Sequence, residues 1–179
     1  LSQGVPPTSL PTHPPVAPGM VARRSGLTGV PMEFGLTSFA ETGADETGRP
    51  LIDHGVRLRN VVEEIRLADE VGLDVYGLGE HHRADMAASA PAITLAAAAS
   101  VTERIRLSSA VIVLSSADPV RTYQDFATPD LVSDGRAEVL GGRGSFIESF
   151  PLFGYDLDAY EDLFTEKLEL LLEIVAHER

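Results

Sequence analysis

The stretch RIRLSSAVIVLSSADPVRTYQDFATPDLVSDGRAEVLGG, residues 104–142, decides the fold. Residues 104–114 end in a run that is apolar on both faces, which is typical of a central strand in a parallel sheet. A helix follows, with Asp118 as its N-cap and Pro119 in its first turn. Residues 136–142 predict the next strand. Strand, helix and strand in succession predict a parallel β-α-β unit.

The same alternation continues on both sides of this stretch. Strands are predicted at residues 32–39 and 73–79, and helices at 57–72, at 89–103 and from residue 158 onward. Gly72 is expected to end the first of these helices, and Asp158 to be the N-cap of the last. The first of these helices has its apolar side chains on one face: Leu58, Val61, Val62, Ile65 and Ala68. The last helix carries a stripe formed by Leu163, Leu168, Leu171, Leu172 and Val175. The pattern amounts to four strand-helix units in a row.

Four such units predict an α/β protein with a parallel sheet and helical cover. A closed eight-stranded barrel typically takes about 250 residues, which is more than these units occupy. Two architectures therefore remain: a small open α/β sheet, or the N-terminal half of a TIM-type (β/α)8 barrel.

Residues 1–31 differ in composition from the rest of the chain. They hold seven of the 12 prolines and no acidic residue, and they lack apolar periodicity. We therefore interpret residues 1–31 as a disordered, proline-rich extension and residues 32–179 as the folded domain, with Met32 as its start.

Composition excludes several classes of protein. The net charge of −13 disfavours nucleic-acid partners, because a phosphate backbone would be repelled. No run approaches the roughly 20 apolar residues of a membrane span. The absence of cysteine excludes disulfides and thiolate zinc sites and fits a cytoplasmic location.

The segment GEHHRAD, residues 79–85, places titratable side chains directly after a predicted buried strand. Parallel α/β folds build their sites at the carboxyl ends of strands. A metal site, a cofactor or catalytic site, and a solvated polar loop all fit these residue types. Metal binding by both His81 and His82 is disfavoured, because neighbours on a strand point to opposite faces.

A second candidate segment is GGRGSF, residues 141–146, which follows the fourth predicted strand. Glycines allow backbone N–H groups to approach an anion closely, and Arg143 offers a planar fork for a phosphate. By itself this segment is equally compatible with a plain strand-to-helix turn that carries a surface arginine.

Several stretches together resemble the bacterial-luciferase-like family of flavin-dependent monooxygenases, which are (β/α)8 barrels. They are MEFGLTSF, EEIRLADEVGLDVYGLGEHHR, residues 104–146 and ESFPLFGYDLDAYEDLFTEKLELL. They occur in the family's order and spacing across most of residues 32–177. The resemblance implies reduced flavin mononucleotide (FMN) as cofactor, dioxygen and a small organic molecule as substrates, a separate flavin reductase as partner, and a homodimer.

The resemblance also implies roles for individual residues. His81 is the catalytic base beside the flavin, with Glu80 supporting it and His82 structural. Ser109, Ala110 and Val111 belong to the cofactor site, with the Ala110–Val111 backbone against the isoalloxazine ring and an unusual cis bond expected there. The phosphate-binding residues are Gly142, Arg143, Gly144 and Ser145.

Two features depart from the family pattern. The sequence contains only the first half-barrel, and Pro129 lies inside the third predicted helix. Because proline removes a helical hydrogen bond and clashes with the preceding turn, a kink or break is expected near residues 125–129.

Three other functions remain open at this stage. A relative of the same fold could transfer hydride with the deazaflavin F420. A non-catalytic half-barrel could act by self-association, because an open parallel sheet exposes strand edges and apolar surface. A metal-dependent hydrolase using His81, His82 and Asp85 is the third.

Overall fold

The computed structural model describes residues 32–177; the predicted extension at residues 1–31 lies outside this range. A four-stranded sheet has the order β1-β2-β3-β5, and β4 and β6 form a separate pair. Every pairing within these sheets is parallel, which confirms the predicted sheet. The strands are β1 (Gly35–Ser38), β2 (Val75–Leu78), β3 (Arg106–Ser109), β4 (Ile112–Val113), β5 (Ala137–Glu138) and β6 (Gly141–Gly142).

Two of the predicted strands are interrupted. The strand predicted at 104–114 is divided into β3 and β4, and the strand predicted at 136–142 into β5 and β6. At the break, the Ser109 hydroxyl accepts a hydrogen bond from Leu140 N (2.8 Å) and donates one to Leu140 O (3.2 Å). This side chain thus replaces the backbone ladder where the two strands separate.

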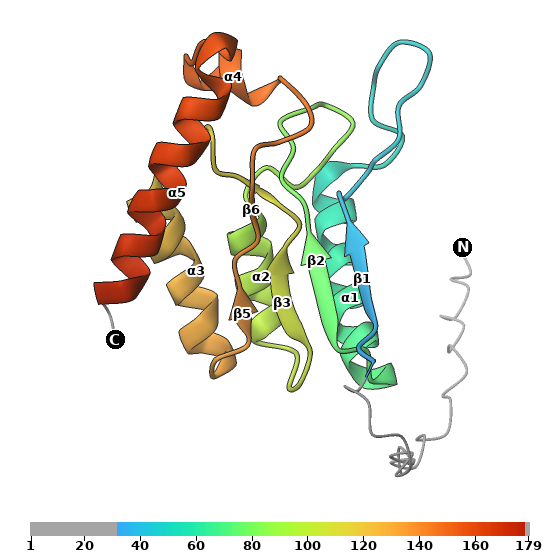
Figure 1. Ribbon diagram of the computed structural model, residues 1–179. Helices are drawn as coiled ribbons and strands as arrows, with labels where there is room; N and C mark the ends of the chain where they lie inside the picture. Colours follow the sequence, from blue (N-terminus) through green and yellow to red (C-terminus); the bar gives the residue numbers. More distant parts are fainter. Residues whose placement is uncertain (1–31, 178–179) are drawn as a thin grey trace, which may run out of the picture. The chain divides into compact units, whose positions relative to one another are not determined.

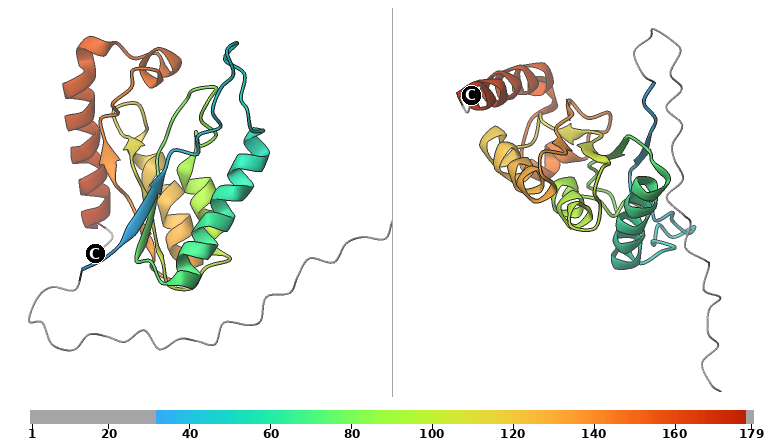
Figure 2. Two further views of the ribbon diagram at one scale, coloured as in Figure 1. Left: turned by 90° about the vertical axis from the view of Figure 1, so that its right-hand side faces the viewer. Right: turned by 90° about the horizontal axis from the view of Figure 1, so that it is seen from below.

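Helices follow the strands as predicted. They are α1 (His54–Val71), α2 (Pro91–Ala99), α3 (Pro119–Ser133), the short α4 (Ser149–Phe153), the 3-10 turn η1 (Leu157–Ala159) and α5 (Tyr160–His177). Figures 1 and 2 show α1, α2 and α3 on one side of the strands, with α5 beside α3, so that the helices form an arc around the sheet. None of the described helices is long and apolar enough to cross a membrane.

Two of the predicted helix ends are confirmed, and two other predictions about the helices are wrong. Gly72 ends α1 with a φ of 86°, and Asp118 caps α3 by accepting from Arg121 N at 2.8 Å. Asp158 is not the cap of the last helix: it lies within η1, and the Asp156 side chain accepts from its backbone N–H. The expected break at Pro129 is also wrong, because α3 continues through this buried residue to Ser133.

The sheet register separates two faces. Tyr76 and Leu107 share a row of the sheet and belong to the buried core that packs on the helices. The next row along the strands holds Thr37, Gly77 and Ser108, which therefore point to the opposite face. The face away from the helices is the inner face of the arc in Figure 2. The row of Thr37, Gly77 and Ser108 gives this face small side chains.

Gly77 on the inner face gives a prediction for stability. A Cβ atom added at Gly77 would lie 2.8 Å from the Ala110 Cβ and 3.2 Å from the Thr37 Cγ2. Gly77→Ala should therefore lower the free energy of unfolding by about 2 kcal/mol through overpacking, as measured by urea denaturation. The control is Gly55→Ala in the first turn of α1, where an added Cβ would meet only the ends of two side chains, Asp53 Oδ1 at 3.1 Å and Arg59 Nη1 at 3.4 Å. Gly55→Ala should therefore change stability much less than Gly77→Ala; equal effects at both sites would contradict the crowding seen at Gly77.

Candidate functional site

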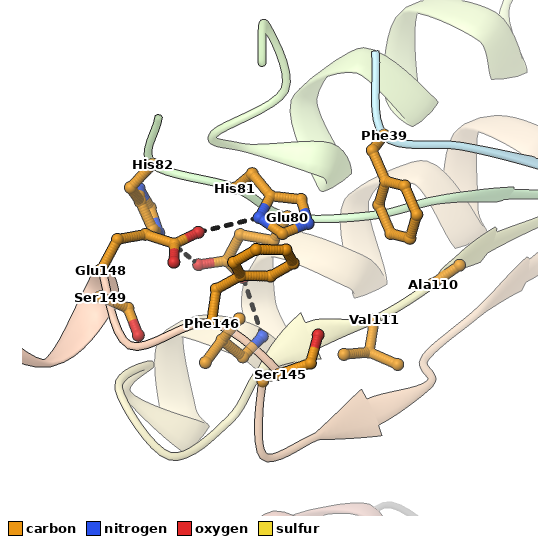
Figure 3. Close-up of a pocket in the computed structure, with 12 residues that line it drawn as sticks. Phe39, Glu80, His81, His82, Ala110, Val111, Ser145, Phe146, Glu148 and Ser149 are labelled. Carbon is orange, nitrogen blue, oxygen red and sulfur yellow. Dashed lines mark hydrogen bonds and ion pairs between the residues drawn. The ribbon is translucent and has the colours of Figure 1, made fainter. Parts of the chain in front are cut away.

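A cavity of about 170 Å³ lies at the carboxyl ends of the strands (Figure 3). It is bordered by the segments that follow β1, β2, β3 and β6, so four chain segments far apart in sequence meet there. The lining residues are Phe39, Glu80, His81, His82, Ala110, Val111, Val113, Gly144, Ser145, Phe146, Glu148 and Ser149. A cavity therefore exists at the end of the sheet where the sequence predicts the functional site.

His81 is buried in the lining and its ring is held on three sides. The rings of Phe39 and Phe146 meet it edge-on, with centroid distances of 5.1 and 5.0 Å. Its Nδ1 lies 2.8 Å from Glu148 Oε1. The Nε2 atom makes no hydrogen bond with any residue between 32 and 177, and Figure 3 shows it on the side of the ring away from Glu148.

Glu80 does not support His81 as expected. One of its carboxylate oxygens lies 2.7 Å from His82 Nε2, and the other accepts from Val113 N at 3.0 Å. Because consecutive side chains on extended backbone diverge, His81 and His82 reach different carboxylates. Glu80 thus ties the loop after β2 to β4, and the carboxylate that contacts His81 is Glu148.

Glu148 is the main residue that sequence reasoning missed. Burial alone would raise its pKa, but the hydrogen bond with His81, its own backbone N–H and the charges of His81 and Arg83 together hold the pKa below its ordinary value. The Glu148 side chain is therefore a carboxylate at neutral pH. It lies 67 residues from His81 in sequence, and a glutamate before an apolar run gives no local signal of such a contact.

The residues predicted to lie against the flavin ring form another wall of the cavity. The Ala110–Val111 peptide bond is cis. Val111 O accepts from Glu80 N at 3.1 Å and Ala110 N donates to Leu78 O at 2.8 Å, which fixes this segment against the end of β2. Ser109 is fully buried beside β5 and does not line the cavity.

The predicted phosphate-binding loop is only partly at the cavity. Gly144 and Ser145 line it, whereas Gly142 and Arg143 do not. Arg143 directs its guanidinium to Glu161 on α5, with an N–O distance of 2.6 Å, and lies over the Phe164 ring. Its phosphate role remains a prediction.

Ser149 adds a buried hydroxyl that sequence reasoning also missed. Among residues 32–177, its Oγ is the one buried side-chain nitrogen or oxygen without a hydrogen-bond partner. Buried hydroxyls are nearly always paired in folded proteins. The cavity wall therefore includes a residue whose buried hydroxyl has no hydrogen-bond partner among residues 32–177.

A second cavity, of about 490 Å³, lies on the far side of Glu80 and His82. It is bordered by the first turns of α2 and α3 and by Phe153 and Tyr155. The two cavities share Glu80 and His82, but the second one reaches neither His81 nor the Ala110–Val111 wall. The second cavity therefore adjoins the predicted site at Glu80 and His82 without reaching His81.

A metal centre is not apparent in the part of the chain that the structure describes. No group of three or more histidine, aspartate or glutamate side chains within residues 32–177 is arranged to hold an ion. The histidines face different carboxylates, and Asp85 forms two 2.9 Å hydrogen bonds with Arg83.

Comparison with known proteins agrees with this geometry. Residues 32–179 match the model of a family described as luciferase-like monooxygenase. The chain belongs to this family. The uncharacterized protein y4wF of Sinorhizobium fredii is 34% identical over 125 residues, which cover 68% of this chain and 36% of y4wF. The predicted family resemblance is thereby confirmed.

Two solved structures of monooxygenases share the fold of this chain. The monooxygenase RslO1 from Streptomyces bottropensis superposes with a TM-score of 0.68 at 26% identity, over 78% of this chain and 42% of RslO1. The oxygenating constituent of 3,6-diketocamphane monooxygenase from Pseudomonas putida, in complex with FMN, gives 0.70 at 21% identity, over 80% and 39%. The chain thus has parallel barrel units and spans well under half the length of these relatives.

Proposed function

We propose that this chain supplies the catalytic half of a flavin-dependent monooxygenase, in which reduced FMN and dioxygen act on a small organic substrate. The observation that carries the proposal is the position of His81: its unpaired Nε2 lies in a cavity at the carboxyl ends of the strands, in a chain of the luciferase-like family. In this proposal a separate reductase supplies the reduced flavin.

The lining residues fit one edge of a flat aromatic ring. Phe39, Val111 and Phe146 provide apolar surface, and His81 and Ser149 provide isolated polar groups, a composition typical of ligand sites. At about 170 Å³ the cavity is smaller than the 300–1,000 Å³ of most whole-ligand pockets. These residues can therefore contact one edge of the flavin ring, but the cavity is too small to enclose the whole cofactor.

Close approach of the glycine loop shapes the cavity wall. A Cβ atom added at Gly142 would lie 2.6 Å from Val111 Cγ2, and one at Gly144 would lie 2.8 Å from Val113 Cγ1. Any larger residue at these positions would displace the loop or the valines. The glycines thus hold Ser145 and Phe146 close to the Ala110–Val111 wall, which keeps the cavity narrow.

The proposed chemistry divides between cofactor and protein. When bound, reduced flavin supplies the electrons for the reaction with dioxygen. His81 accepts or returns a proton at Nε2 while the Glu148 carboxylate holds Nδ1. The rings of Phe39 and Phe146 pack against the imidazole and restrict its rotation.

Arg143 is proposed to contact the flavin phosphate. Its present partner, Glu161, is exposed, and such surface ion pairs contribute about 0–1 kcal/mol. Exchange of the Glu161 carboxylate for a phosphate would therefore cost little, and the planar guanidinium suits either group.

Flavin titration of the purified chain tests this function. FMN fluorescence should be quenched on binding, and Ser145→Phe should weaken binding at least tenfold, because this exposed lining residue can place a ring in the cavity without disturbing the core. The control, Ser100→Phe at the exposed end of α2, should bind as the wild type does.

Two results would count against the proposal. The first is an absence of quenching in the wild-type chain, and the second is equal affinity in the wild type and in Ser145→Phe. A parallel titration with F420 tests the cofactor, since saturable binding of F420 without binding of FMN would assign the site to hydride transfer.

A further inference from the structure

We propose that Glu148 is the positioning residue of His81: it fixes the proton on Nδ1 and leaves Nε2 as a lone-pair acceptor that faces the cavity. The catalytic meaning of this inference rests on the proposed function. The contact itself involves only residues of this chain, so it is testable without a cofactor.

The geometry determines which atom carries the proton. A carboxylate oxygen can only accept hydrogen bonds, and Glu148 is ionised at neutral pH because its pKa is lowered. The 2.8 Å contact therefore requires a hydrogen on His81 Nδ1. In the neutral imidazole the other nitrogen, Nε2, then has a free lone pair. Since a free histidine in water carries its proton mainly on Nε2, the protein would reverse the ordinary preference.

The two partners are held in place by separate packing. Glu148 directly precedes α4, whose Phe150 is fully buried and stacks on Tyr160 with a centroid distance of 5.6 Å. The Tyr160 hydroxyl donates to Gly144 O at 2.8 Å, which closes the loop that carries Glu148. The carboxylate is thus presented by an anchored segment and not by a free side chain on the surface.

Among residues 32–177, no other carboxylate forms a hydrogen bond with His81. Asp85 lies within electrostatic range of His81, but both of its oxygens accept hydrogen bonds from Arg83. Glu80 is the nearest in sequence, but both of its oxygens have partners, His82 and Val113 N. Figure 3 shows the two histidine–carboxylate contacts as distinct dashed lines from adjacent residues. His81 thus has a carboxylate partner at Nδ1 and no hydrogen-bond partner among residues 32–177 at Nε2. A histidine that transfers protons requires such a free ring nitrogen.

Nitrogen-15 NMR of the ring-labelled, 179-residue chain measures the tautomer directly. In the neutral imidazole of His81, the two ring nitrogens should show a protonated Nδ1 and a bare Nε2, with at least about a tenfold excess of this tautomer. A wild-type spectrum with the proton on Nε2 of His81 would overturn the proposal, whatever the variants do.

Variants separate the hydrogen bond from general packing. Glu148→Ala should abolish the excess, whereas Glu148→Gln, whose amide oxygen can still accept, should keep part of it. Glu80→Gln is the matched control, because it should alter the His82 signals and leave the His81 tautomer as in the wild type. An unchanged His81 tautomer in Glu148→Ala, with a folded amide spectrum, would refute the positioning role. Flavin binding is measured separately, so failure of the proposed function would not affect this result.

Discussion

Replacing Arg136 with methionine should lower the free energy of unfolding by roughly 3–4 kcal/mol. All five N–H groups of its guanidinium donate hydrogen bonds at 2.7–3.2 Å. The acceptors are Ser133 O, Thr102 Oγ1, Ile105 O, Ala99 O and Thr102 O. One side chain thus joins the end of α3 to the turn between α2 and β3, and methionine would remove all five hydrogen bonds.

Chemical denaturation of two further variants checks the reason. Arg136→Lys retains the charge, but an ammonium group has three donors at one point and cannot span these carbonyls, so about 2 kcal/mol should still be lost. Arg66→Met, in which an exposed arginine loses two glutamate partners, should change stability little. Similar losses at Arg66 and Arg136 would show that charge, and not the partly buried hydrogen-bond network of Arg136, determines the loss of stability.

Replacing Asp69 with alanine should cost roughly 3 kcal/mol of stability. The Asp69 carboxylate, near the end of α1, is buried and accepts from the backbone N–H groups of Glu103, Arg104 and Ile105 at 2.7–3.0 Å. No other acceptor in the described structure is recorded for these three donors. Asp45→Ala removes a similar set of hydrogen bonds from an exposed loop and serves as the matched control, with little expected change.

The Asp69 effect should depend on pH in one direction. Burial opposes ionisation, but the three backbone hydrogen bonds and the Arg104 charge outweigh it, so the pKa lies below the ordinary 3.8. A depressed pKa in the folded state gives stability that is fully present above 3.8 and is lost as pH falls through the folded-state value. The difference in unfolding free energy between wild type and Asp69→Ala should therefore shrink below pH 3.8. A constant difference down to pH 2 would contradict this assignment.

Much of the fold could be predicted because its signals are local. The 3.6-residue spacing of Val61, Ile65 and Ala68 predicts the buried face of α1, and these residues are buried. Capping chemistry correctly marks Gly72 and Asp118. Strand interruptions were not predicted, because they depend on how Ser109 and Leu140 meet across 31 residues.

The site could be predicted only in part. The end of β2 identifies His81 as a site residue, since strand ends in parallel sheets converge on one edge. Glu80, which is adjacent to His81 in sequence, is the predicted supporting carboxylate, but it contacts His82. The carboxylate that contacts His81 is Glu148, which directly precedes α4. The same limit applies to Arg143, whose guanidinium lies against α5 and away from the cavity.

Sequence by itself determined the alternation of strands and helices, the parallel sheet and the end of that sheet at which chemistry is concentrated. These properties follow from periodicity and from residue preferences that act over a few neighbours. The tertiary structure alone decided which carboxylate holds His81, which donors Asp69 satisfies and where Arg136 directs its hydrogen bonds. Apart from the hydrogen bond from Arg136 to Ser133 O, these contacts join residues 31 to 67 positions apart. A pairing at that range is set by packing geometry, which no local pattern encodes.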